Sequence, residues 1–187
     1  MRIEATRRRW LLLAAQAITS AAAAQGSGDW ALVQPGTAVL FRHANAPGIG
    51  DPPQFRLDDC STQRNLDAAG RQQAAQIGKQ FRQRGIEVKT VWSSRWCRAR
   101  ETADLAFPGL RRDEPAFDSM FGRGATSAAQ TEAAKALLLQ WTGPGVLVVF
   151  SHQVNISALT GTATSSGEGV IVKAEGGGLQ VMGKVRP

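Results

Sequence analysis

The chain has 187 residues, of which 43% are hydrophobic and 20% charged, and this predicts one globular domain with a sizeable core. Its formal charge is +7 at pH 7, but residues 1–24 hold four arginines and one glutamate, so the rest of the chain carries +4. That mild charge gives little support for nucleic-acid binding, which usually requires a dense basic face.

The N-terminal 24 residues have the pattern of a signal peptide. Arginines precede a mostly apolar run, Leu11–Ile18, and small residues up to Ala24 offer a cleavage site. The apolar run is too short for a comfortable membrane span, and Thr6–Leu11 resembles a twin-arginine export signal. We therefore expect a signal peptide over residues 1–24, a single domain over 25–187, a periplasmic or secreted location and no stable membrane insertion. The alternative is an uncleaved anchor or a frayed basic helix.

Two short apolar runs each lead into a histidine. Ala38–Phe41 is followed at once by Arg42 and His43, and Val146–Phe150 is followed closely by His152; the chain has two histidines in all. Runs this short and apolar predict buried strands of a parallel sheet. In open α/β sheets, ligands bind beyond the carboxyl ends of the strands, which is where these polar residues would lie.

A helix is predicted from Asp67 to about Gln83. The Asp67 carboxylate suits an N-cap, because it accepts hydrogen bonds from free amides of the first turn, and Gly85 is placed to end the helix. Before this helix, residues 25–36 form a leader and residues 45–62 a long, turn-rich loop. Long loops of this kind often shape a binding pocket.

A second strand, Val88–Trp92, leads into a second helix that runs to Ala106. Ser93 or Ser94 is expected to cap this helix, which places Arg98 in its first turns. At such a helix start, backbone amides and a cationic side chain face the same anion.

Residues 109–125 are predicted to be irregular. The remaining predicted elements are a helix over Ala128–Trp141, the strand Val146–Phe150, a helix from Ser151 to Leu159, and late strands over Gly169–Ala174 and Leu179–Met182. This order predicts an α/β protein with three layers, α/β/α, in which helices cover both faces of a mostly parallel central sheet.

The chain has two cysteines, Cys60 and Cys97. In an exported protein such a pair predicts a disulfide, which would pin the loop of residues 47–62 beside Arg98; two unpaired thiols are the alternative. The cysteines and histidines do not have zinc-finger spacing, so no metal site is predicted.

Four motifs in order resemble those of the histidine phosphatase superfamily, the phosphoglycerate-mutase-like fold. Arg42-His43-Ala44 is similar to its Arg-His-Gly signature, and Leu66–Ala74 to its helix-opening pattern. Ser93–Ala103 resembles its second motif, and Ser151-His152 its third. The likeness spans about residues 37–160. It departs from the family at Ala44, where glycine is usual.

The resemblance implies a metal-independent phosphatase that needs no cofactor and forms a phosphohistidine on His43. Arg42 and Arg98 would bind the phosphoryl oxygens with paired N–H donors, and their charge favours a neutral, nucleophilic imidazole. His152 would bind the transferring group and stabilise its charge. The expected partner is a small phosphorylated substrate, and the expected state is a monomer or weak dimer.

The acid that protonates the leaving group is not fixed by the motifs. One branch of the family places it directly after the second histidine, where this chain has Gln153. We expect Asp118 to take this role, because its aromatic neighbours favour desolvation, with Glu114 as the other candidate. The alternative is that Asp118 is a solvated loop acid.

Asn45 and Arg64 are further candidates for substrate binding, although a solvated surface position is as good an interpretation of Arg64. Two other functions fit the same motifs. One is a catalytically weak phosphate-binding protein of this fold, and the other is a phosphohistidine or phosphoramidate phosphatase. A phosphomutase is less favoured, because the chain is short and predicted to be exported.

Overall fold

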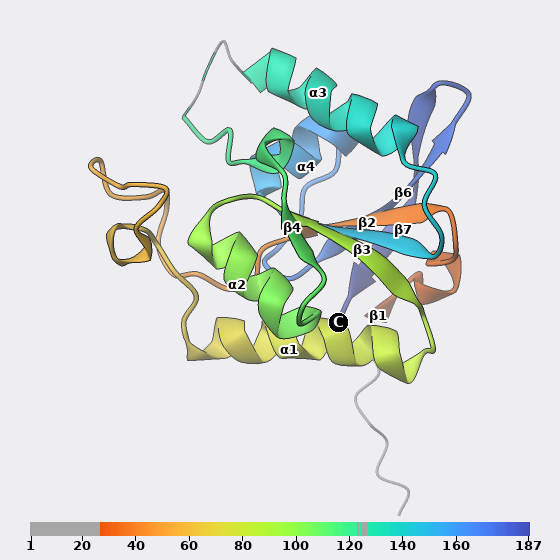
Figure 1. The fold of residues 1–187 in the computed structure, drawn as a ribbon, viewed down its shortest axis with the longest axis horizontal. Helices are drawn as coiled ribbons and strands as arrows, with labels where there is room; N and C mark the ends of the chain where they lie inside the picture. Colours follow the sequence, from red (N-terminus) through yellow and green to blue (C-terminus); the bar gives the residue numbers. More distant parts are fainter. Residues whose placement is uncertain (1–26, 123, 125–126) are drawn as a thin grey trace, which may run out of the picture.

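A computed structural model describes residues 27–122, 124 and 127–187 (Figure 1). The predicted signal peptide, residues 1–24, lies outside the described residues. No helix in the described part of the chain is long and apolar enough to cross a membrane.

One seven-stranded sheet forms the centre of the domain, with the order β1-β7-β6-β2-β5-β3-β4. Its parallel part consists of β2 (Thr37–Arg42), β5 (Val146–Ser151), β3 (Val88–Ser93) and β4 (Arg111–Asp113). Its antiparallel part consists of β6 (Gly169–Glu175), β7 (Gly178–Arg186) and β1 (Ser27–Gly28). The prediction of a sheet that is mostly parallel in its centre is confirmed.

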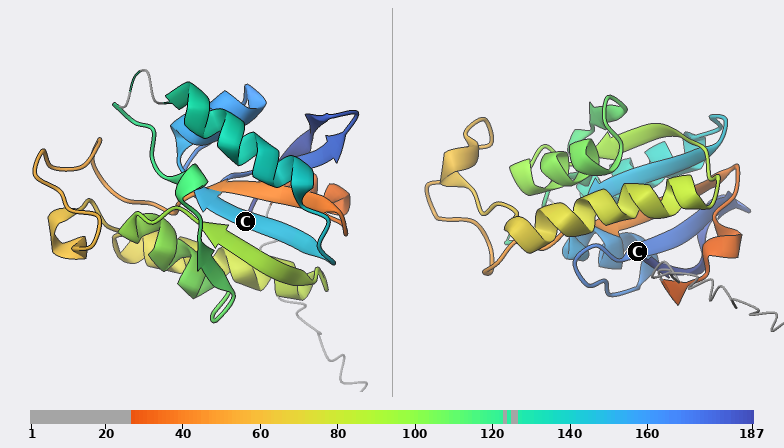
Figure 2. Two further views of the ribbon diagram at one scale, coloured as in Figure 1. Left: turned by 45° about the horizontal axis from the view of Figure 1, so that its top comes forward. Right: turned by 90° about the horizontal axis from the view of Figure 1, so that it is seen from below.

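Helices cover both faces of this sheet (Figures 1 and 2). α1 (Ala68–Gln83) and α2 (Cys97–Ala106) lie on one face, and α3 (Ser127–Gln140) and α4 (Gln153–Thr160) lie on the other. The short 3-10 helices are η1 (Trp30–Leu32), η2 (Cys60–Thr62) and η3 (Pro115–Phe117).

Alternating residues of β2 build the two halves of the core. Val39 and Phe41 are buried with Phe81 of α1, whereas Ala38 and Leu40 belong to the cluster that includes α3 and α4 residues. Successive side chains of a strand point to opposite faces, so a continuous apolar run suits a strand covered on both sides. The three-layer α/β/α prediction is therefore confirmed.

Local signals define α1 as predicted. The Asp67 side chain accepts a hydrogen bond from the Gly70 amide at 2.6 Å, and the helix ends two residues before Gly85, whose φ is +64°. The late hairpin of β6 and β7 turns at Gly176 and Gly177, both with positive φ, as the run of glycines indicated.

Three expectations were wrong or incomplete. β4 lies within the stretch predicted to be irregular, and β1 within the predicted leader. β4 is the outermost strand of the sheet, and its sequence is Arg-Arg-Asp. Such a sequence lacks the alternation of apolar and polar residues that indicates a strand. The predicted serine cap of α2 is also wrong: its N-cap is Trp96, which makes no side-chain cap bond, while the Ser94 hydroxyl accepts from the Trp96 amide at 3.2 Å.

α1 and α2 approach closely at one glycine. A Cβ on Gly78 would lie 1.9 Å from the backbone oxygen of Ala106, so a side chain at this position forces the two helices apart. The packing of α2, which carries Arg98, therefore depends on the absence of a side chain at Gly78.

Gly78→Ala is expected to lower the free energy of unfolding by about 1–3 kcal/mol, although alanine improves helix propensity by about 1 kcal/mol. Urea unfolding monitored by circular dichroism measures this change. Lys79→Ala, at the exposed neighbouring position, is the control and should change stability by less than about 0.5 kcal/mol. A Gly78→Ala variant as stable as the native chain contradicts the close contact.

Candidate active site

The parallel strands β2, β5 and β3 are neighbours and end at one edge of the sheet. Backbone hydrogen bonds continue beyond their ends: the His43 amide donates to the Ser151 carbonyl at 2.9 Å, and the Ser94 amide to the Phe150 carbonyl at 2.9 Å. The residues that follow these strands are thereby brought together. The rings of His43 and His152 have centroids 5.4 Å apart.

The hydrogen bonds of His43 fix its tautomer. Its Nδ1 lies 2.7 Å from the Ala44 carbonyl oxygen, which can only accept, so Nδ1 carries the proton. Its Nε2 accepts from Nε of Arg98 at 3.2 Å. Burial, followed by the charge of Arg98, lowers the pKa of His43 to about 3. At neutral pH, His43 is therefore an uncharged imidazole with a lone pair on Nε2.

Arg98 is a buried cation with a buried counter-ion. Its Nη1 lies 2.7 Å from an Asp51 carboxylate oxygen, and the two side chains are 2% and 8% exposed. Burial alone would raise the pKa of Asp51, but the hydrogen bond and charge of Arg98 outweigh it, and the pKa is lowered. Asp51 also accepts from the Trp96 indole at 2.9 Å and from the Arg64 amide at 3.0 Å. It is thus an ionised acid that accepts from three donors.

Sequence reasoning missed Asp51. It stands in the turn-rich loop before α1, which also carries Asp58 and Asp59, and no local pattern separates these three acids. What distinguishes Asp51 is its pairing with Arg98, 47 residues further along the chain.

Arg42 and Arg64 complete a cluster of three guanidinium groups. Nη1 of Arg42 donates to Gln153 at 3.1 Å and to the Thr164 carbonyl at 3.2 Å, while its buried Nε has no partner within the described structure. Nε of Arg64 donates to the Gly50 carbonyl at 2.9 Å, so this residue braces the loop. The unpartnered Nε of Arg42 leaves a donor for an anion.

Ala44 replaces the glycine usual after the first histidine and is fully buried. Its amide donates to the Thr102 hydroxyl at 3.1 Å. No described residue other than glycine has a positive φ, so the backbone at this position does not require glycine.

His152 is held by a serine. Its Nε2 lies 2.9 Å from the Ser94 hydroxyl, which in turn lies 3.4 Å from the carboxylate of Asp118. Burial, followed by the charge of His43, lowers the pKa of His152 well below its usual value. Both histidines are therefore neutral at physiological pH, and Ser94 orients the second one.

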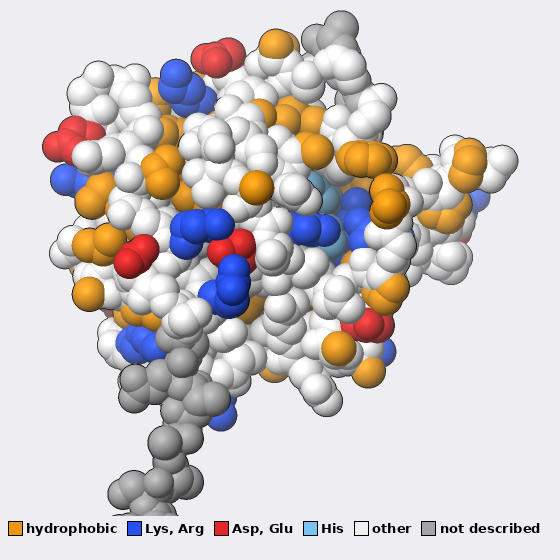
Figure 3. Space-filling model, turned by 180° about the vertical axis from the view of Figure 1, so that it is seen from behind, with side chains coloured by type: hydrophobic (Ala, Val, Ile, Leu, Met, Phe, Trp, Pro, Cys, Tyr) orange, Lys and Arg blue, Asp and Glu red, His pale blue; other side chains and the backbone are white. Residues whose placement is uncertain are grey.

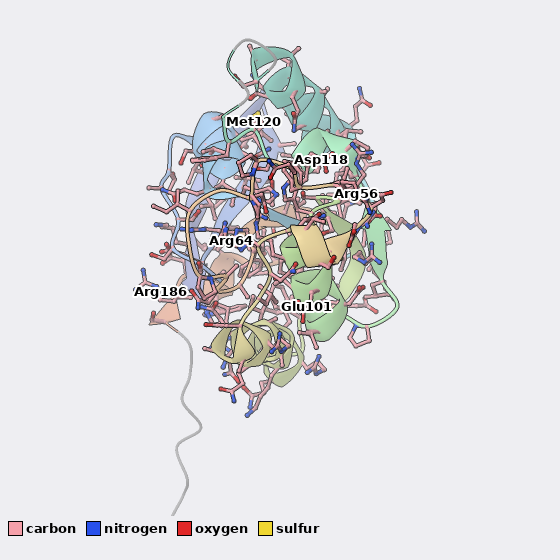
Figure 4. All side chains as sticks on the ribbon, turned by 90° about the vertical axis from the view of Figure 1, so that its left-hand side faces the viewer. Arg56, Arg64, Glu101, Asp118, Met120 and Arg186 are labelled. Carbon is pink, nitrogen blue, oxygen red and sulfur yellow. A yellow bond between two sulfur atoms is a disulfide. The ribbon has the colours of Figure 1, made fainter. Side chains whose placement is uncertain are left out.

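Asp118 lies next to this network but outside the cavity described below. Its carboxylate accepts from Nε and Nη2 of Arg95 at 2.8 and 2.6 Å and from the Arg95 amide at 2.8 Å. These contacts argue against its expected role as the acid, because both oxygens are already engaged by Arg95. Glu114 is not at the cavity either, since it caps η3 by accepting from the Ala116 amide at 3.2 Å. Figure 4 labels Asp118 and, in the loop, Arg64.

Asn45 does not line the cavity, contrary to its expected contact with substrate. Its side-chain amide donates to the Asp67 carboxylate at 2.9 Å, and its backbone amide donates to Gln73 at 2.9 Å. These bonds fasten the start of the loop to the first turns of α1.

The predicted disulfide between Cys60 and Cys97 is present, with Cα atoms 5.7 Å apart. Gln63 reinforces the connection, because its side-chain oxygen accepts from the Cys97 amide at 3.0 Å. The loop that carries Asp51 is therefore joined to the first turn of α2, which carries Arg98.

A cavity of about 620 Å³ lies above these groups. Arg42, His43, Arg64, Arg98 and His152 line it, together with Asp51, Gln153 and Ser119. Its remaining lining is apolar and comes mainly from the long loop and the segment after η3. Figure 3 shows histidine and arginine side chains in a hollow edged by hydrophobic ones.

The lowered pKa values predict that neither histidine of the folded protein is protonated on titration from about pH 8 to about pH 5. Imidazole NMR signals measure this directly, since the chain has two histidines. In denaturant both should titrate near pH 6.5. Below that pH the unfolded chain binds protons that the folded chain does not, so stability should fall as pH drops from about 6.5 towards 3. A folded-state titration of His43 near pH 6.5 contradicts the prediction.

Replacing both cysteines by alanine is expected to reduce the free energy of unfolding by about 3–4 kcal/mol, because the bridge closes a loop over a sequence separation of 37 residues. Guanidinium unfolding of this variant against the oxidised native chain gives the value. The native chain with reductant should behave like the variant. Equal stability of oxidised and reduced protein contradicts this prediction.

Two comparisons with known proteins agree with each other. The sequence model described as "Histidine phosphatase superfamily (branch 1)" matches residues 38–118. A search of curated proteins gave no match. Solved structures resemble the chain over most of its length at low sequence identity, which concerns the fold alone.

Three of these structures illustrate the likeness. The alpha-ribazole phosphatase from Shigella flexneri has a TM-score of 0.57 at 15% identity, covering 78% of this chain and 94% of its own. A mycobacterial glucosyl-3-phosphoglycerate phosphatase has a TM-score of 0.57 at 17% identity, covering 79% and 97%. The protein histidine phosphatase SixA, complexed with tungstate, has a TM-score of 0.51 at 18% identity, covering 81% and 97%.

Proposed function

Because this chain has the sequence pattern and the fold of the histidine phosphatase superfamily, we propose that it hydrolyses phosphomonoesters through a phosphohistidine on His43. The observation that carries the proposal is the state of His43. A neutral imidazole, with its lone pair on Nε2, lies at the floor of a cavity among three arginines. Such a nitrogen is a nucleophile, and such a cavity attracts a dianion.

Phosphate binding would use the free donors of the arginines. Nε of Arg42 has no partner among the described residues, and Nε of Arg98 would exchange its bond to His43 for one to a phosphoryl oxygen when substrate binds. This exchange also frees the His43 lone pair for attack. The Asp51 pair holds the rest of the Arg98 guanidinium in place during the exchange.

The reaction would proceed in two displacements. His43 Nε2 attacks phosphorus, the P–N bond forms, and the P–O bond to the alcohol breaks with its electron pair on the leaving oxygen. The leaving oxygen takes a proton from solvent. Water then attacks phosphorus and loses a proton to solvent, the P–N bond breaks, and phosphate leaves with His43 neutral again. The arginines and His152 stabilise the charge on the transferring group. The described residues hold no group of three His, Cys, Asp or Glu side chains that could bind a metal ion.

We also propose that the protein is exported. The disulfide is consistent with an oxidising compartment, and the N-terminal sequence has the charge and apolar pattern of a signal peptide. The substrate would then be met outside the cytoplasm.

A second candidate activity is the hydrolysis of phosphoramidates, including phosphohistidine. The observation that favours it is the lack of a free acid: among described residues, Asp51 is the one acidic residue that lines the cavity, and it is ion-paired with Arg98. A phosphoramidate takes its proton readily on nitrogen and needs no strong acid from the protein.

Turnover of 4-nitrophenyl phosphate by the purified protein in EDTA tests the proposed function. His43→Ala is expected to lower kcat at least about a thousandfold, because it removes the nucleophile. Rapid quenching with labelled substrate should trap acid-labile, alkali-stable phosphate on the native chain and none on the variant.

Arginine variants test the binding site in the same assay. Arg42→Ala and Arg98→Ala should each weaken inhibition by inorganic phosphate about tenfold or more, since each loses charge-assisted hydrogen bonds. Arg56→Ala, which removes an exposed arginine of the long loop that does not line the cavity, is the control and should change little. Phosphate inhibition without turnover would favour the phosphate-binding protein, and undiminished turnover by His43→Ala would contradict the mechanism.

A further inference from the structure

The mouth of the cavity is apolar and exposed. Ile49 and Phe121 are the two most exposed large hydrophobic residues in the described part of the chain, at 91% and 57%, and both line this cavity. Exposed apolar groups that gather at a cavity mouth mark a site for an apolar ligand, because water leaves them when the ligand binds. In Figure 3, hydrophobic side chains edge the hollow that contains the histidines.

Aromatic rings also line this cavity. Phe55 and Trp96 have ring centroids 5.6 Å apart, and both line the cavity. A Cβ on Gly50 would lie 3.4 Å from the Phe121 ring, so Phe121 packs against the long loop. Rings from separate segments that line one cavity favour a flat, apolar group against them.

Among the described residues, the charges that line the cavity match those of a phosphate. Its lining contains three guanidinium groups, of Arg42, Arg64 and Arg98, and one ionised carboxylate, of Asp51. The surplus of two positive charges balances a phosphomonoester dianion. Neither a carboxylate nor an ammonium on the rest of the substrate would find an unpaired counter-charge among the described residues of the lining.

The described part of the lining also lacks a group to protonate a strongly basic leaving oxygen. Asp51 is held ionised by Arg98, and Gln153 cannot titrate. An alkoxide leaves slowly without a proton, whereas a phenoxide, whose conjugate acid has a pKa of about 10, leaves far more readily.

From these observations we propose that the substrate is the phosphate monoester of an uncharged, apolar aromatic alcohol, with its ring among Ile49, Phe55 and Phe121. The proposal rests on the proposed function and narrows it to one substrate class. The P–O bond to the aryl oxygen breaks, and the phenoxide takes its proton from water after it leaves the cavity.

Two esters whose leaving groups have similar basicity distinguish a preference for an apolar ring from a difference in the intrinsic reactivity of the ester. 2-Naphthyl phosphate and O-phosphotyrosine both release a phenolic oxygen with a pKa near 10, but the second carries an ammonium and a carboxylate. We expect kcat/KM to be about tenfold or more higher for the naphthyl ester, since its second ring buries additional apolar surface. Ile49→Ser and Phe121→Ser should each reduce this preference about threefold or more.

Leu110→Ser is the matched control, because Leu110 is an exposed leucine (38%) that does not line the cavity. It should leave the preference unchanged. Equal kcat/KM for the two esters, with turnover that depends on His43, would overturn the substrate class and leave the phosphatase proposal standing.

Binding gives a readout that does not require turnover. Calorimetry of the native chain should show about tenfold tighter binding of 2-naphthylmethylphosphonate than of 4-phosphonomethylphenylalanine, for the same reason. If no ester or phosphoramidate is hydrolysed but this preference holds, the proposed phosphatase fails and the ligand class stands. If the two phosphonates bind equally, the apolar aromatic class is overturned whatever the enzyme hydrolyses.

Discussion

The arrangement of the site depends on keeping one buried cation in place. Arg98 is almost completely buried, and a guanidinium that remains charged inside a protein must be given partners for its N–H groups. The chain supplies the Asp51 carboxylate, the Arg64 carbonyl and the ring nitrogen of His43. The first two partners come from the connection between β2 and α1, and the third follows the end of β2. The hydrogen bonds of this one side chain therefore join the strand end, the long loop and α2.

This dependence explains why the long loop is so heavily fastened. Its start is bonded to α1 through Asn45, its middle is braced by Arg64, and its end is joined to α2 by the disulfide. A mobile loop would let water reach the Arg98–Asp51 pair and weaken it. The same fastened loop carries Ile49 and Phe55, so the anion-binding floor and the apolar mouth are fixed by one set of contacts.

Much of the fold could be predicted from the sequence because its signals are local. Asp67 and Gly85 mark the ends of α1 within a few residues, and the two apolar runs before His43 and His152 show buried parallel strands. The position of both histidines at one sheet edge follows from the strand topology. β4 was not predicted, because it is an edge strand and its sequence, Arg-Arg-Asp, has no apolar pattern.

The parts of the site that could not be predicted depend on contacts between distant segments. Asp51, the partner of Arg98, is one of three aspartates in one loop that the sequence does not distinguish. Asp118 was expected to be the acid, but its carboxylate is paired with Arg95. Ser94 was expected to cap a helix, whereas its hydroxyl lies against His152. In each case the residue type was informative, but its partner is chosen by tertiary structure, which spacing alone does not encode.

The hydrogen bond from His43 to its neighbouring carbonyl has one more consequence. Because Nδ1 is committed to the Ala44 oxygen, the ring presents only Nε2 to the cavity. In the proposed reaction the covalent intermediate would therefore be a single regioisomer, phosphorylated on the nitrogen remote from the main chain. A backbone carbonyl, which no side-chain substitution removes, would set the regiochemistry of the enzyme.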